Sequence, residues 1–158
     1  ELQQALKRDR VAYVYLGVEL GGRPKSKALF DDGVADYEQM AATSQFAEGL
    51  ERVVQGASSH RIALMCSEQN PTECHRCLLV GRALQAHGVQ VEHILSDGSV
   101  VSQEEIAEEL LRLSGSTSED LFLSKEERLT LAYRERSRRV AYSEKAEENS
   151  SESRQKAG

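Results

Sequence analysis

A short apolar run followed by a strong helix start most constrains how this chain can fold. Residues 60–66 read HRIALMC, a nearly continuous apolar run that is typical of a β-strand covered on both faces, as in a parallel sheet. Asn70 can cap the next helix, Pro71 suits the first helical position, and Glu73 can complete a capping box. We expect this helix to run to about His87, just before a glycine.

The neighbouring segments extend the same alternation. Residues 11–17 (VAYVYLG) and 89–95 (VQVEHIL) are rich in β-branched and aromatic residues and are predicted to be strands. A helix is expected at about residues 44–54, and Ser102 with Glu105 predicts a capped helix that runs to about residue 113. Strands that alternate with helices predict an α/β fold: a mostly parallel sheet flanked by helices in Rossmann-like layers, with a C-terminal helical extension.

A change in composition divides the chain. Residues 1–113 are expected to form the α/β core, and SGSTSED lies within a predicted linker over 114–123. A C-terminal helix is expected over 124–142, opened by a serine that has a glutamate three residues later. Residues 143–158 have almost no apolar side chains, so a disordered tail is expected there.

Composition restricts the class of protein. The chain has 158 residues and a net charge of −6, which argues against nonspecific coating of nucleic acid. No stretch approaches the roughly 18 apolar residues of a membrane span, and the start ELQQ has no apolar leader. The three cysteines are clustered and odd in number, which indicates a reducing, cytoplasmic setting rather than a disulfide scaffold. The oligomeric state is not defined by these features.

All three cysteines and one histidine lie within twelve positions, in CSEQNPTECHRC, residues 66–77. In a parallel sheet, ligands bind beyond the carboxyl ends of the strands, so this segment is expected to border a crevice. Cys66 is a candidate nucleophile, and Glu68 or His75 is a candidate proton-transfer group. Arg76, beside Cys74, is a candidate clamp for an anion.

Other interpretations of this segment stay open. Cys66, Cys74, Cys77 and a histidine could ligate zinc, and Cys74 and Cys77 have the spacing of a redox pair. Both readings require Cys77, which we expect to pack inward, and we assign no metal to the site. The plain alternative is that the cysteines are small buried hydrophobic residues while His75 and Arg76 bond to neighbouring loops.

Several segments together resemble a known family. They read YVYLGVELGGRP, IALMCSEQNPTECHRCLLVGRAL, VEHILSDGS and AYRERSRRVAYS, and they are similar to the bacterial and archaeal domain of unknown function 488 family over most of residues 1–142. The resemblance implies a fold and a site location more than a reaction, because the activity of the family is not settled. Family members usually begin with two strands, which carry a Gly-His-Ser-like turn and an Asp-Val-Arg ending. We therefore expect this chain to start inside the helix that follows them, with part of the polar crevice upstream.

We predict an enzyme-like domain that binds a small anionic or nucleotide-like ligand in a Cys-His-Arg crevice. Gly21, Gly22 and Arg23 would form one wall, opposite the cysteine-containing segment. Neither the reaction, the enzyme status nor a cofactor is defined by the residues. One alternative is a nonenzymatic module for nucleic acid or protein, based on Arg134, Arg136, Arg138 and Arg139 with Tyr133 and Tyr142 interleaved. A second alternative is a structural zinc site.

Overall fold

The computed structural model describes residues 1–115 and 122–144 of the chain. The helical elements are α1 (Leu2–Arg8), η1 (Lys27–Leu29), α2 (Tyr37–Ala41), α3 (Ser44–Ala57), η2 (Pro71–Glu73), η3 (Arg76–Gly81), α4 (Arg82–Ala86), α5 (Gln103–Leu113) and α6 (Lys125–Val140). The strands are β1 (Phe30–Asp31), β2 (Val34–Ala35), β3 (Glu92–Ile94) and β4 (Val100–Ser102). In this part of the chain the fold is therefore dominated by helices.

The predicted α/β fold with a parallel sheet is wrong. The described strands form antiparallel pairs: β1 with β2, and β3 with β4 in the register His93 to Val101. Residues 11–17 and 60–66 are extended, but they belong to neither sheet. They are also largely exposed, with 63% of Val14 and 65% of Met65 accessible to solvent. Strand propensity reflects how well residues fit a pleated surface, and no described strand pairs with these two segments.

The third predicted strand forms, but with a different partner. Part of residues 89–95 becomes β3, which turns back through Asp97 and Gly98 to pair with β4. Gly98 has φ +85°, a left-handed conformation that glycine adopts readily. The side chain of Asp97 accepts a hydrogen bond from the backbone N–H of Ser99 at 2.9 Å and stabilises the turn. A hairpin therefore stands where a parallel crossover was expected.

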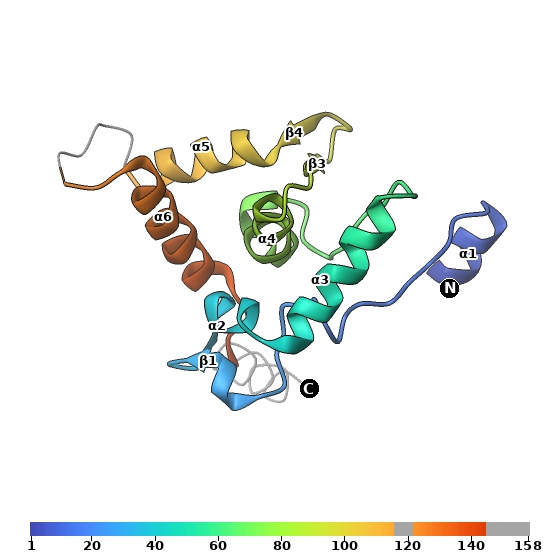
Figure 1. Ribbon diagram of the computed structural model, residues 1–158, viewed down its shortest axis with the longest axis horizontal. Coiled ribbons are helices and arrows are strands. Elements are labelled where there is room, and N and C mark those ends of the chain that lie inside the picture. The colour runs from blue at the N-terminus through green and yellow to red at the C-terminus, as the bar shows by residue number, and fades with distance from the viewer. Residues whose placement is uncertain (116–121, 145–158) are drawn as a thin grey trace, which may run out of the picture.

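The core is built around the central helical segment formed by η3 and α4. Figure 1 shows α4 end-on in the middle, with α3, α5 and α6 on three sides. Leu78 and Leu84 from this segment are almost fully buried, together with Leu50 of α3 and Leu110 of α5. Burying a side chain of this size contributes roughly 1.5–3 kcal/mol. A Cβ at Gly81 would lie 2.6 Å from a side-chain oxygen of Gln103, so this glycine allows α5 to pack closely.

Local capping signals predicted the starts of α5 and α6 well, whereas the capping box predicted for Asn70 and Glu73 does not form. Ser102 and Glu105 form a capping box at α5, as Ser124 and Glu127 do at α6. Asn70 caps the next turn, where its side chain accepts from the N–H of Thr72 at 3.0 Å. The continuous helix expected from residue 71 to 87 is wrong, however. It is interrupted at Cys74 (φ −116°, ψ 129°) and resumes as the π-helical turn η3.

The C-terminal helix is part of the same body. α6 covers most of the predicted 124–142 helix and packs against α5. After α6 the chain returns to β2, where Ala35 donates to the carbonyl of Tyr142 at 2.9 Å and Val34 forms a bridge with Ser143. Most of the predicted linker (116–121) and of the predicted disordered tail (145–158) lies outside the described residues. Among the described helices, none combines the length and apolar character that crossing a bilayer requires.

Candidate functional site

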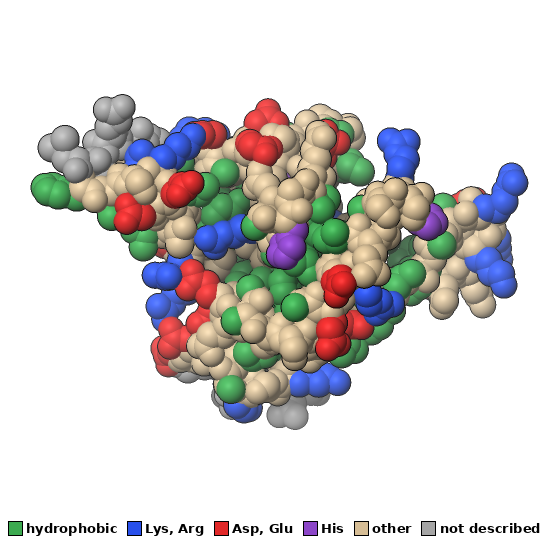
Figure 2. Space-filling view, in the orientation of Figure 1, with side chains coloured by type: hydrophobic (Ala, Val, Ile, Leu, Met, Phe, Trp, Pro, Cys, Tyr) green, Lys and Arg blue, Asp and Glu red, His purple; other side chains and the backbone are tan. Residues whose placement is uncertain are grey.

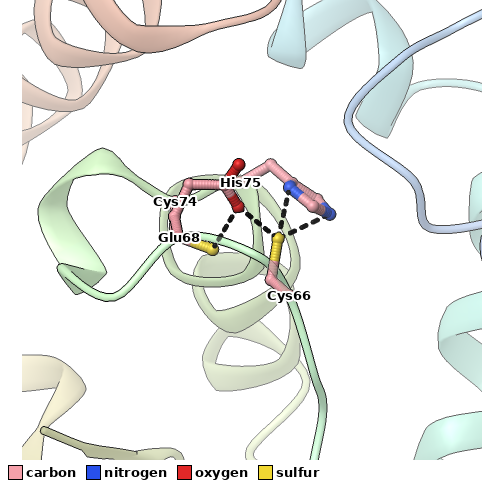
Figure 3. Close-up of side chains that lie close together, drawn as sticks. All are labelled: Cys66, Glu68, Cys74 and His75. Atoms are coloured by element: carbon pink, nitrogen blue, oxygen red, sulfur yellow. Dashed lines mark hydrogen bonds between the residues drawn. The ribbon is translucent and has the colours of Figure 1, made fainter. Parts of the chain in front are cut away.

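Four reactive side chains gather at one point between the two extended segments and the central helix. Cys66 and Glu68 come from the loop before η2, and Cys74 and His75 come from the start of η3 (Figure 3). One donor atom from each residue lies within 4.8 Å of the other three. Cys66 Sγ donates to Glu68 Oε2 at 2.5 Å and lies 3.3 Å from His75 Nδ1, while Cys74 Sγ donates to Glu68 Oε2 at 3.7 Å.

The interrupted helix brings these side chains together. The single 3₁₀ turn η2 reverses the chain after Asn70, and the extended Cys74 then directs the backbone over residues 66–68. Arg136 of α6 holds this turn from outside, because its Nε donates to the Thr72 carbonyl at 2.8 Å and its Nη2 to Glu73 at 3.1 Å. Had the helix begun at Pro71 and continued, as the sequence predicted, the direction of Cys74 would be different.

The environment shifts the pKa values of Glu68, Cys74 and His75. Burial tends to raise the pKa of the Glu68 carboxyl, but hydrogen bonds from Cys66 and Ser67 outweigh this effect and lower that pKa to about 2. Burial raises the pKa of the Cys74 thiol to about 12 and lowers the pKa of the His75 imidazole below its usual value. Near neutral pH, an ionised carboxylate and a neutral imidazole therefore lie beside the thiols.

A cavity of about 710 Å³ opens beside this cluster. The predicted loop of Gly21, Gly22 and Arg23 lines it together with Cys66, Glu68 and His75, so the structure brings these six predicted site residues to one space. Gly22 lies against His75: a Cβ at Gly22 would be 2.7 Å from the imidazole Cγ. The glycine loop therefore shapes the position of the imidazole directly.

Two predicted site residues do not line this cavity. Cys74 is fully buried, and it contributes to the cluster without lining the cavity. Arg76, the predicted anion clamp, is half-buried and its Nη1 donates to the carbonyl of Leu64 at 3.3 Å. Cys77 packs inward as expected, fully buried and 3.9 Å from Gln103 Oε1, and burial raises the pKa of its thiol to about 12.

Two tyrosines lie in the wall of the cavity, where the sequence did not place them. Tyr142, which follows α6, lies under the Arg23 guanidinium, whose central carbon is 5.0 Å from the ring centre. Tyr37 of α2 is buried in the same wall, and burial, with smaller contributions from the nearby cysteines and Glu68, raises its pKa. Nothing in the local sequence around either tyrosine indicates this placement, because each is brought there by the packing of distant helices.

At least four of the five arginines of α6 form ion pairs with acidic side chains of the chain. Arg134 pairs with Glu38 at 3.0 Å, Arg136 with Glu73 at 3.1 Å, Arg138 with Asp31, and Arg139 with Glu135 at 2.6 Å. Figure 2 shows acidic and basic side chains next to one another over α6 and α2. Tyr133 is buried and not available for stacking. This arrangement does not test the nucleic-acid alternative, which stays a prediction, but each of these four arginines lies beside an acidic side chain.

Comparison with known proteins gives one match. No curated protein and no solved structure matches the chain. The family model described as "Domain of unknown function DUF488" matches residues 1–83, a segment that contains both the glycine loop and the cluster of Cys66, Glu68, Cys74 and His75. The match is shorter than the predicted resemblance over most of residues 1–142, because the segments VEHILSDGS and AYRERSRRVAYS lie outside it. The predicted family is confirmed, and the chain belongs to the domain of unknown function 488 family.

Proposed function

We propose that this protein is an enzyme-like domain that binds a small anionic or nucleotide-like ligand in the cavity between its glycine loop and its cysteine-containing loop. The observation that carries the proposal is the meeting of these two loops: Gly21, Gly22 and Arg23 line the same space as Cys66 and His75. Cavities of several hundred Å³ that combine apolar walls with a few convergent polar groups are typical of small-molecule sites.

Two basic side chains give one part of the cavity a positive charge that favours an anion there. Arg23 and Lys25 line it and are exposed, and Arg23 is oriented by its contact with Tyr142. A guanidinium can bind a phosphate or carboxylate through two parallel hydrogen bonds. Glu19, Glu68 and Glu73 also line the cavity, so the anion is expected on the Arg23 side, away from the Cys66 cluster.

The cluster supplies reactive groups to the same cavity. The Cys66 thiol is half-buried and within hydrogen-bond distance of both Glu68 and His75. A neutral imidazole can accept the thiol proton, and the resulting thiolate is a nucleophile. The three cysteines form no disulfide, which suits a reducing compartment such as the cytoplasm.

Ligand-induced stabilisation tests this proposal. We expect inorganic phosphate, or a mononucleotide from a panel, to raise the melting temperature. Ligand at about 100 times its Kd stabilises by about 2.7 kcal/mol, which for a protein of this size is roughly 5–11 °C. Arg23→Met removes a charge-assisted contact worth about 1.5–3 kcal/mol and should weaken binding about tenfold or more.

Arg134→Gln is the matched control, because Arg134 is an exposed arginine that pairs with Glu38 outside the cavity. It should bind the ligand as the wild type does. The proposal fails if no member of the panel stabilises the wild type, or if Arg23→Met and the wild type respond equally.

A further inference from the structure

We propose that Cys66, Glu68, Cys74 and His75 form a binding site for one Zn²⁺ ion. The set differs from the zinc ligands considered from the sequence, because Glu68 takes the place of Cys77. The carrying observation is geometric: one sulfur, oxygen or nitrogen atom from each residue lies within 4.8 Å of the others, and the four side chains point toward one another (Figure 3).

The donor atoms and their spacing suit tetrahedral zinc. Zn²⁺ binds sulfur at about 2.3 Å and nitrogen or oxygen at about 2.0–2.2 Å, so tetrahedral ligands stand roughly 3.3–3.8 Å apart. The Cys66 sulfur is 3.3 Å from His75 Nδ1, and the Cys74 sulfur is 3.7 Å from Glu68 Oε2, so these two pairs already have this spacing. The Cys66 sulfur and Glu68 Oε2 are closer, at 2.5 Å, and would separate by about 1 Å when both bind the ion. Two thiolates and one imidazole match the soft and borderline ligands that zinc prefers, unlike magnesium or calcium, and zinc also accepts a carboxylate oxygen.

The surroundings support ligation. Ser67 Oγ donates to Glu68 Oε1 at 2.8 Å, which leaves Oε2 directed at the sulfurs. Gly22 leaves room for the imidazole of His75.

The four proposed ligands differ in their exposure to solvent. Cys74 is buried at the base, Cys66 and His75 are half-buried, and Glu68 is exposed. An ion can therefore enter from the cavity side and fix the loop of residues 66–68 to the start of η3. Cys77 is excluded, because its sulfur lies beside Gln103 in the core.

This inference is independent of ligand binding at Arg23. Bound zinc would turn Cys66 and His75 into ligands rather than nucleophile and base. It would also place an electrophile on the wall of the cavity opposite the proposed anion position. Arg23→Met should leave metal binding unchanged and weaken anion binding, so failure of one proposal is distinguishable from failure of the other.

Spectroscopic titration of the full chain with Co²⁺, followed by competition with Zn²⁺, tests the site. We expect one equivalent to bind, with the visible spectrum of a tetrahedral ion and a thiolate charge-transfer band. Glu68→Gln retains the size of an exposed side chain and should weaken binding at least about tenfold. Cys66→Ser should weaken binding further and reduce the thiolate band per bound cobalt to about half.

Cys77→Ser is the matched control, since it removes a thiol from the same segment but outside the cluster. It should leave the stoichiometry and the thiolate band unchanged. Far-ultraviolet circular dichroism of each variant establishes that it is folded. The proposal is overturned if the folded wild type binds no cobalt or zinc, if binding by folded Cys66→Ser and Glu68→Gln equals that of the wild type, or if Cys77→Ser loses the thiolate band.

Discussion

Gly22→Ala tests how the glycine loop and the cysteine-containing loop depend on each other. A Cβ at position 22 would lie 2.7 Å from His75 Cγ, 2.9 Å from Nδ1 and 3.0 Å from Cβ. Carbon atoms in favourable contact are about 3.5–4.0 Å apart, so the two loops must separate by roughly 1 Å. The contacted atoms include the base of the histidine side chain, which cannot rotate away as a flexible end could. The backbone of Gly22 is not left-handed, so any cost is steric.

Overpacking of this kind costs about 1–3 kcal/mol. Urea denaturation should therefore show a lower free energy of unfolding for Gly22→Ala, and a cost of 2 kcal/mol corresponds to a melting temperature roughly 4–8 °C lower. Displacement of His75 should also weaken cobalt binding. Gly56→Ala is the control: its Cβ meets only Ile62 Cδ1, the far end of a flexible side chain, and it lies within α3. It should be neutral or stabilise by up to about 1 kcal/mol.

Harmless surface changes usually alter the free energy of unfolding by no more than about 0.5 kcal/mol. If Gly22→Ala differs from the wild type by no more than this, the reasoning is refuted. That result would mean that the glycine loop does not press on the imidazole, and the wall shared by the two loops would be looser than described.

Three further predictions concern groups outside the cluster. Burial lowers the pKa of His93, so the unfolded chain takes up a proton that the folded chain does not. The stabilising contribution of neutral His93 should be fully present above about pH 6.5. Below that pH the free energy of unfolding should fall by at most about 1.4 kcal/mol per pH unit. Urea denaturation should show a smaller fall for His93→Gln. Gln103→Ala should cost about 2–5 kcal/mol in the same assay, because it opens a core cavity and removes hydrogen bonds of 2.7 Å to His93 and Tyr133. Arg134→Gln should change stability by less than about 1 kcal/mol, since its pair with Glu38 is exposed.

Features set by neighbouring residues were predictable from the sequence. The capping boxes at Ser102 and Ser124 depend on contacts three residues apart, and both form as expected. The grouping of Cys66, Glu68 and His75 also follows from closeness along the chain once a turn at Asn70 is recognised. Local chemistry was therefore sufficient for the helix starts and for most of the cluster.

Features that need a distant partner were not predictable. Whether residues 11–17 and 60–66 become strands depends on a neighbour that supplies a hydrogen-bonded ladder, and sequence composition cannot identify one. The turn at Asp97 and Gly98 between apolar runs was a hairpin signal that the α/β pattern overrode. The ion pairs of the α6 arginines join residues up to 107 positions apart, so a basic helix in the sequence became a neutralised one in the fold.

The return of the chain after α6 makes completion of the cavity a late event in synthesis. The family model matches residues 1–83, yet Val140 and Tyr142 form part of the wall around the glycine loop. A nascent chain that has released only the matched segment already carries every proposed zinc ligand, but it lacks the ring on which Arg23 rests. It also lacks Arg136, which holds the turn between Asn70 and Cys74, so both the metal site and the anion site are completed only after α6 has been synthesised.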